Sequence, residues 1–126
     1  EIVYPELVRE YAKRADLMST ISNDSWFGRS IGPLQHRQMA RMRALENGRY
    51  LIRGTNNGVS AIIDERGKIV ARSPQFRKLA LEGEAEVMLG QTPFSRVGSM
   101  PVLVLCGILL VLIMGAGSMG LRLQHD

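Results

Sequence analysis

The sequence predicts a mixed α/β (α+β) domain over residues 1–96, one transmembrane helix over residues 97–121 and a short tail over residues 122–126. Two observations lead to this fold class. The first part of the chain alternates helix-type apolar spacing with short β-branched runs, whereas residues 97–121 contain no ionisable side chain except Cys106. The chain of 126 residues has room for one small core, because a domain of this size buries roughly two-thirds of its extended surface.

The first predicted helix begins near Pro5, a residue that the first helical turn tolerates. Apolar residues then recur at the spacing of one helical face, at Val8, Tyr11, Ala12 and Ala15. Residues 17–22 follow as a short run of apolar and β-branched residues, which is typical of a largely buried strand.

A loop and a second helix are expected next. Residues 23–28 are a loop by composition, although they contain two adjacent aromatic residues, Trp26 and Phe27. Gly32-Pro33 then opens a helix that extends to about residue 47. Its apolar stripe consists of Met39, Met42 and Leu45.

Three strands are expected after the second helix, over residues 50–55, 58–63 and 68–71, because short apolar runs with period-two spacing occur there. The last two flank a tight connection in which Gly67 is available for a positive φ angle. A further strand is expected over residues 79–88, where apolar residues alternate with glutamates. The helices are expected to cover one face of the resulting sheet.

Residues 100–121 are predicted to form the transmembrane helix. A helix of about 20 predominantly apolar residues crosses a hydrocarbon core of roughly 30 Å, and this stretch is long enough. The alternative is a buried core helix, but so small a domain has too little protein to surround a helix that is apolar on every face. A secretory signal peptide is excluded, because the stretch lies at the C-terminal end and lacks a basic leader.

Composition excludes several classes of function. The 16 basic and 12 acidic residues give a net charge of +4, which is too mild an excess to indicate a nucleic-acid partner. The single cysteine, Cys106, leaves no disulfide framework and no thiolate metal site. A reactive cysteine must be a thiolate, which apolar surroundings disfavour, so Cys106 is expected to pack rather than react. No metal and no cofactor are predicted.

Three polar residues invite catalytic interpretations that we do not adopt. Histidine is a common general base, but His36 lies on a basic helix without a Cys or Asp partner at a readable spacing. We therefore interpret it as a surface or capping residue. Asn56 and Asn57 are interpreted as turn and backbone-bonding residues rather than catalysts.

Four segments of the chain resemble the C-terminal part of the apolipoprotein N-acyltransferase family. They are Ser22-Asn23-Asp24-Ser25-Trp26-Phe27-Gly28, Gln35-His36, the run from Met39 to Glu46, and Thr55-Asn56-Asn57-Gly58. The resemblance runs over essentially the whole chain. Residues 43–47 are nitrilase-like in general, but the first and last segments together with a following apolar helix are more specific, since soluble nitrilases and amidases have no such helix.

The resemblance implies that residues 1–96 are the C-terminal portion of a four-layer αββα nitrilase-like (CN hydrolase) domain. It implies a multi-pass enzyme of the bacterial inner membrane, with a periplasmic catalytic domain and a cytoplasmic C-terminus. Such enzymes transfer an acyl chain from a phospholipid to the N-terminal amine of a diacylglyceryl-cysteine lipoprotein, through a cysteine thioester. By the family pattern the cysteine, a glutamate base and a lysine lie upstream of this chain, which alone is expected to be inactive.

The resemblance also provides four site candidates. Glu1 matches a family glutamate close to the nucleophile and is expected to have a supporting role, although a solvated terminal side chain is the alternative. Trp26 and Phe27 match aromatics on a loop over the active site and are expected to grip lipid acyl chains rather than fill the core. Asn23, in the same motif, is expected to bind substrate. The expected partners are a phospholipid acyl donor, a diacylated lipoprotein acceptor and the membrane.

Two alternative functions stay open. One is a non-catalytic, single-span membrane protein with a small binding domain, which requires a natural start near Glu1. The other is a nitrilase-type amidase, which shares the fold but not the apolar helix. The coding sequence upstream of Glu1 distinguishes the first alternative, and the apolar helix argues against the second.

Overall fold

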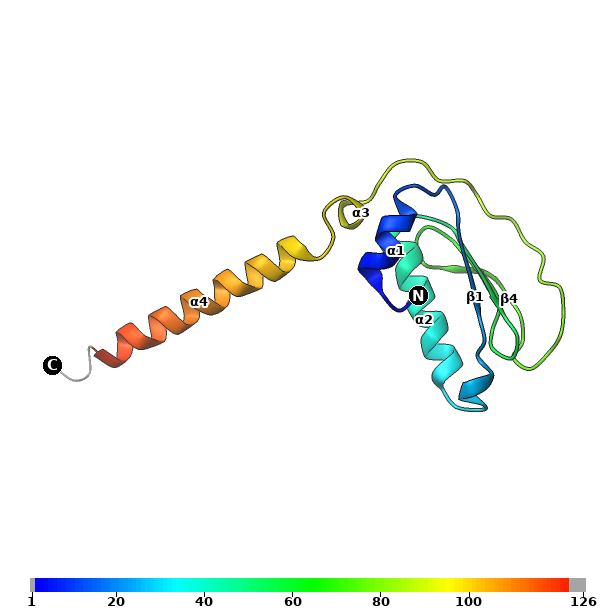
Figure 1. Cartoon of the computed structure of the whole chain (residues 1–126), viewed down its shortest axis with the longest axis horizontal. Helices are drawn as coiled ribbons and strands as arrows, with labels where there is room; N and C mark the ends of the chain where they lie inside the picture. Colours follow the sequence, from blue (N-terminus) through cyan, green and yellow to red (C-terminus); the bar gives the residue numbers. More distant parts are fainter. Residues whose placement is uncertain (1, 123–126) are drawn as a thin grey trace. The chain divides into compact units, whose positions relative to one another are not determined.

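The computed structural model describes residues 2–122, with side chains through residue 116. The chain divides into two units, residues 1–96 and residues 97–126. The first unit contains a four-stranded sheet with helices on it, and the second consists mainly of one long helix (Figure 1). The predicted mixture of helices and strands in residues 1–96 is confirmed.

The sheet has the strand order β1 (Met18–Ser22), β2 (Leu51–Thr55), β3 (Ala61–Ile63) and β4 (Ile69–Arg72). β1 and β2 are parallel, whereas β3 pairs antiparallel with both β2 and β4. Parallel neighbours require a crossover connection, and here it contains α2 (Gly32–Asn47). The βαβ unit therefore brings the carboxyl ends of β1 and β2 to the same edge of the sheet.

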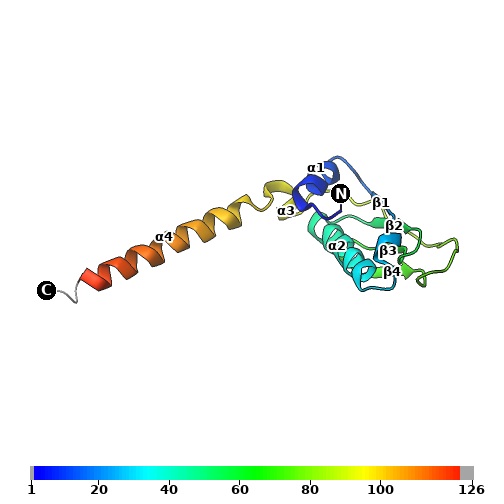
Figure 2. The same ribbon diagram turned by 60° about the horizontal axis from the view of Figure 1, so that its bottom comes forward.

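α1 (Pro5–Ala12) and α2 lie on one face of the sheet, as Figures 1 and 2 show. Small side chains let α2 pack closely, because Ala40 and Ala44 of this helix are completely buried. α2 is capped at its C-terminal end by Gly48, whose φ of 60° is in the left-handed region that favours glycine. The core between the helices and the sheet consists of Ile2, Ala12, Met18, Ala40, Ala44, Leu51, Ala61 and Ile63.

The strand predicted over residues 79–88 is wrong, because these described residues adopt no regular secondary structure. They cross the sheet face opposite α2 (Figure 1). Gly83 in this segment lies against the side chains of Ile62 and Ala71. Near the end of this segment the Met88 amide donates a hydrogen bond to the Asp16 carbonyl (3.2 Å). The alternating pattern is compatible with an extended backbone that packs on a sheet, but it does not require a neighbouring strand.

Two helices follow, α3 (Pro93–Val97) and α4 (Met100–Arg122). The prediction of a helix over residues 100–121 is confirmed, and its described side chains, in residues 100–116, are all exposed. Among the described residues, no helix combines the length and the apolarity that a membrane crossing requires. The transmembrane part of the prediction is therefore not confirmed. Of the predicted tail, residues 123–126 lie outside the described residues.

Candidate functional site

The candidate site lies where two loops meet at the carboxyl ends of β1 and β2. Because these strands are adjacent and parallel, the loops that follow Ser22 and Thr55 leave the sheet at the same edge. The first loop forms a short 3-10 helix, η1 (Ser25–Phe27), before α2 begins. The site candidates Asn23, Trp26 and Phe27 belong to this first loop.

Asp24 is at the centre of the site. Its side chain is completely buried. Oδ1 accepts hydrogen bonds from Ser22 Oγ (2.7 Å) and His36 Nδ1 (3.1 Å), and Oδ2 accepts one from Arg53 Nη2 (2.8 Å). An ionised carboxylate can only accept, so His36 Nδ1 carries a proton in this arrangement. Asp24 thus ties together β1, α2 and β2.

Two opposing effects act on the pKa of Asp24. Burial raises the pKa, because a low-dielectric environment disfavours the charged carboxylate. The Ser22 hydroxyl, the charge of Arg53 and the hydrogen bond from His36 lower the pKa and outweigh burial. The pKa of Asp24 therefore lies below its usual value, and at neutral pH the side chain is the counter-ion of Arg53.

Arg53 is not fully satisfied by this single carboxylate. Its side chain is completely buried, yet within the described part of the chain Nε and Nη1 have no hydrogen-bond partner. The ion pair also needs space beside Asp24, which Gly58 provides. A Cβ atom on Gly58 would lie 2.1 Å from Asp24 Oδ2, so any larger residue at this position would displace the carboxylate.

Asn23 and Asn56 join the two loops. Asn56 Oδ1 accepts a hydrogen bond from the Asp24 amide (3.1 Å), and Asn56 Nδ2 donates one to Asn23 Oδ1 (2.6 Å). Asn23 Oδ1 also accepts from the Ser25 amide (3.1 Å). The interpretation of Asn56 as a backbone-bonding residue is confirmed. The Asn23 oxygen is engaged within the loop, and the expected role of Asn23 in substrate binding stays a prediction.

The two loop aromatics lie in different environments. Trp26 is 86% exposed, whereas Phe27 is 43% exposed. The Phe27 ring contacts His36 edge to face, with ring centroids 6.3 Å apart, and packs so closely on Gly32 that a Cβ there would lie 2.3 Å from a ring carbon. Neither aromatic belongs to the buried core. Their expected role in gripping acyl chains stays a prediction.

Sequence reasoning missed the partners of His36. The interpretation of His36 as a residue without a Cys or Asp partner at a readable spacing is wrong, because Asp24 lies on the preceding loop and accepts the hydrogen bond from His36 Nδ1. One signal in the sequence pointed to this network: Arg53 interrupts an otherwise apolar strand, and a buried arginine needs an anion. Spacing alone did not identify Asp24 as that anion, because the two residues are brought together by the parallel pairing of β1 and β2.

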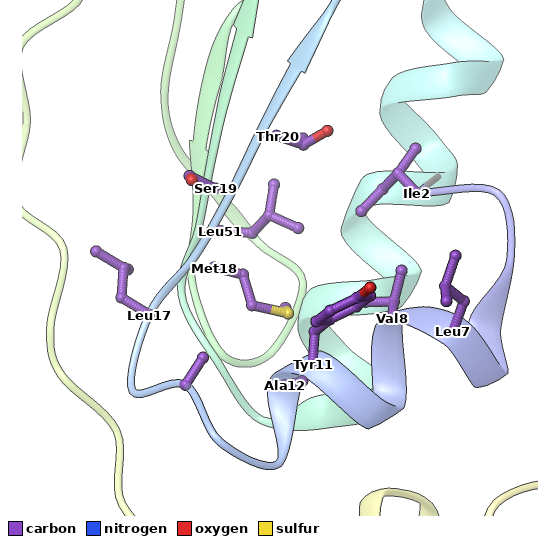
Figure 3. Close-up of a pocket in the computed structure, with 11 residues that line it drawn as sticks. Ile2, Leu7, Val8, Tyr11, Ala12, Leu17, Met18, Ser19, Thr20 and Leu51 are labelled. Carbon is purple, nitrogen blue, oxygen red and sulfur yellow. The ribbon is translucent and has the colours of Figure 1, made fainter.

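An apolar cavity of about 290 Å³ lies between α1 and the sheet (Figure 3). Val8 and Tyr11 of α1 line it from one side, and Met18 and Leu51 of the sheet line it from the other. Its mostly aliphatic lining suits an apolar group. Glu1, the predicted supporting residue, lies outside the described residues.

Comparison with known proteins confirms the resemblance inferred from the four sequence segments. The carbon-nitrogen hydrolase family model matches residues 1–100. The apolipoprotein N-acyltransferase of Pseudomonas putida is 54% identical over 110 residues, which cover 87% of this chain and 22% of that protein. The apolipoprotein N-acyltransferase of Azotobacter vinelandii is 56% identical over 110 residues, which cover 87% of this chain and 21% of that protein. The chain therefore spans about a fifth of the length of these relatives.

Among solved structures, Nit3 of Saccharomyces cerevisiae, a member of branch 10 of the nitrilase superfamily, is similar to this chain with 26% sequence identity. The TM-score is 0.47, and the match covers 61% of this chain and 31% of the Nit3 chain.

Proposed function

Since the chain belongs to the carbon-nitrogen hydrolase family, we propose that it is part of an apolipoprotein N-acyltransferase of the bacterial inner membrane. The observation that carries this proposal is the identity of more than half of the aligned residues with two proteins of that name. The whole enzyme would move an acyl chain from a phospholipid to the N-terminal amine of a diacylglyceryl-cysteine lipoprotein.

The proposed reaction has two steps. A cysteine thiolate attacks an ester carbonyl of the phospholipid, and the lysophospholipid leaves as an alcohol after taking up a proton. The lipoprotein amine then attacks the thioester carbonyl and loses a proton, so that an amide forms and the thiolate is released. We assign the cysteine, the glutamate base and the lysine to the part of the enzyme upstream of Glu1. Residues 1–126 alone would then form no thioester.

Within that enzyme we assign a lipid-binding role to the loop that carries Trp26 and Phe27. The base of the loop is held by the buried Asp24 and by Asn56, while the Trp26 side chain is exposed. A large exposed aromatic on an anchored loop can contact an acyl chain without a large loss of loop entropy on binding. Asn23 lies in the same loop and is proposed to contact the substrate. Glu1 is proposed to support the reaction near the nucleophile.

We place α4 in the membrane, with residues 1–96 on the periplasmic side and the C-terminus on the cytoplasmic side. The absence of charge in residues 97–121 and the exposure of apolar side chains such as Leu103, Leu109 and Leu112 support this placement. A soluble reporter protein fused to residues 97–126 tests it. We expect the fusion to remain in the membrane pellet after a carbonate wash, and release into the supernatant would contradict the placement.

Acyl transfer by the full-length protein tests the proposed function. The purified protein in detergent is incubated with a phospholipid and a diacylated lipopeptide, and the peptide is analysed by mass spectrometry. We expect one additional acyl group on the N-terminal amine. A protein that instead hydrolyses small amides would be an amidase. A folded protein with neither activity would favour a non-catalytic role.

A further inference from the structure

A second cavity, of about 560 Å³, lies between the first half of α2 and the segment that follows β4. Two arginines line it from different elements, Arg37 from α2 and Arg72 from the end of β4. None of the described residues that line this cavity is acidic. The cavity is also lined by Leu34, Val59, Ser73 and Gln75.

The register of the sheet explains why Arg72 faces α2. Arg53 pairs with Ala61, and Ala61 pairs with Arg72. Residues that are directly paired across strands have side chains on the same face of the sheet. Because Arg53 and Ala61 belong to the buried face covered by α2, Arg72 also projects toward that helix. Leu34 and Val59 provide apolar walls beside it.

Several hydrogen-bond donors around this cavity lack acceptors. Arg37 Nε and Gln75 Nε2 are buried and have no hydrogen-bond partner within residues 2–122. Ser73 Oγ accepts from the Ser60 amide (3.0 Å), which leaves the hydroxyl proton able to donate elsewhere. Phe76, directly after Gln75, has a φ of 60°, an uncommon angle for an aromatic residue. Backbone of this kind is concentrated at functional sites.

The charge around Arg37 is unbalanced. Its pKa is lowered first by burial and then by the positive charges of Arg72, Arg41 and Arg53. Asp24, which follows the carboxyl end of β1, already accepts hydrogen bonds from Ser22, His36 and Arg53. An anion in the cavity would therefore relieve like-charge repulsion and supply acceptors for the unpaired donors.

We propose that this cavity binds a phosphate-type oxyanion, held between Arg37 and Arg72 and contacted by Ser73 and Gln75. Guanidinium groups match the geometry of phosphate oxygens with paired N–H donors. Residues with hydrogen-bond donors line the cavity from α2 and from residues 72–75, and a tetrahedral anion offers them more acceptor oxygens than a carboxylate does. The phosphate is either free or part of a phospholipid headgroup, because both present the same chemistry.

Calorimetric titration of the full-length protein in an uncharged detergent tests this site. The probes are inorganic phosphate, dihexanoyl phosphatidylglycerol and, as a control, acetate, all at constant ionic strength. We expect saturable phosphate or phospholipid binding that Arg37→Gln and Arg72→Gln each weaken about tenfold or more. The matched control is Arg66→Gln, which removes the same charge from an exposed turn and should change the affinity less than about twofold.

Every outcome of these titrations is decisive. Binding of both phosphate and phospholipid supports a site for the shared group, and binding of only one of them identifies the source. No saturable binding, equal binding of acetate, or equal effects of Arg66→Gln and Arg72→Gln would overturn the proposal. Circular dichroism checks that the variants fold. If Arg37→Gln does not fold, Arg72→Gln still tests the site, because Arg72 is exposed. The titration mixtures contain no acyl acceptor, so they measure binding and not acyl transfer. The proposal of this phosphate site can therefore be overturned while the proposed acyl transfer is confirmed.

Discussion

Asp24 Oδ2 and Arg53 Nη2 lie 2.8 Å apart, and neither side chain is exposed to solvent. Asp24 directly precedes η1, which carries the exposed Trp26, whereas Arg53 belongs to the central part of β2. Desolvation offsets much of the attraction within a buried ion pair, so the intact pair stabilises the fold little more than two apolar residues of the same size would, although removal of one partner is costly. The consequence is mainly geometric, because the pair attaches the aromatic loop to the sheet at a fixed point.

Asp24→Asn should destabilise the fold by about 3 kcal/mol, because it leaves the buried Arg53 charge uncompensated. The thermal melting temperature of the full-length protein in detergent measures this effect. Asp16→Asn is the matched control, since Asp16 is exposed and its substitution should shift stability by less than about 0.5 kcal/mol. Equal melting temperatures for Asp24→Asn and Asp16→Asn would contradict the structural role of the pair.

The stabilisation by Asp24 should disappear in acid. Its pKa in the folded protein lies below the ordinary value of 3.8, so the unfolded state binds more protons between the two pKa values. The contribution is complete above the ordinary pKa and is lost as the pH falls through the folded-state pKa. The difference in melting temperature between wild type and Asp24→Asn should be constant above about pH 5 and shrink below about pH 4. A difference in melting temperature that grows in acid would contradict the lowered pKa of Asp24.

Gly58→Ala should destabilise the fold by about 1–3 kcal/mol through overpacking, because the new Cβ would lie 2.1 Å from Asp24 Oδ2. Gly107→Ala is the control, since no atom lies within 4 Å of a Cβ at that position. Thermal melting of both variants measures the effect. If Gly58→Ala melts at the wild-type temperature, the carboxylate is not confined as described.

Trp26→Ala should raise the KM for phospholipid without unfolding the protein. Trp26 is 86% exposed, so its loss should change stability by less than about 0.5 kcal/mol. If a bound acyl chain buries the Trp26 ring, Trp26→Ala would remove roughly 1.5–3 kcal/mol of contact energy. Such a loss, made equally to bound substrate and transition state, raises KM and leaves kcat nearly unchanged. Steady-state acylation kinetics at varied phospholipid concentrations measure both parameters.

Phe27→Ala provides a comparison for this test. The Phe27 ring packs on Gly32 and His36, so its loss should lower the melting temperature, unlike the loss of the Trp26 ring. The double variant Trp26→Ala, Phe27→Ala should still form the acyl-enzyme at saturating phospholipid. If acylation is normal but transfer to the lipopeptide fails, the loop serves the amine substrate, and the assignment to the acyl donor is wrong.

The sequence predicted those elements that local signals determine. α2 begins with Gly32-Pro33 and ends at Asn47, as expected, because start and stop signals act through nearby backbone atoms. The strand prediction over residues 79–88 was wrong because local signals do not determine strand pairing. Period-two alternation reports which side chains face the sheet, but strand formation also requires a partner strand elsewhere in the chain.

The candidate site was only partly predictable for the same reason. The loop motif was identified, whereas the arginine inside an apolar strand was not recognised as half of a buried ion pair. The contact between Asp24 and Arg53 depends on the parallel register that pairs Ile21 with Gly54 and Thr20 with Arg53. Register is a property of the assembled sheet, so neither this contact nor the role of Gly58 beside it follows from spacing.

The position of the thioester on the full-length protein tests the proposed acyl transfer most directly. The protein is incubated with a phospholipid that carries a labelled acyl chain, and the labelled peptide is located by mass spectrometry. The adduct should lie on a cysteine upstream of Glu1 and persist in Cys106→Ala, while residues 1–126 alone should acquire no label. An adduct on Cys106, in the apolar helix α4, that disappears in Cys106→Ala would contradict the proposed function.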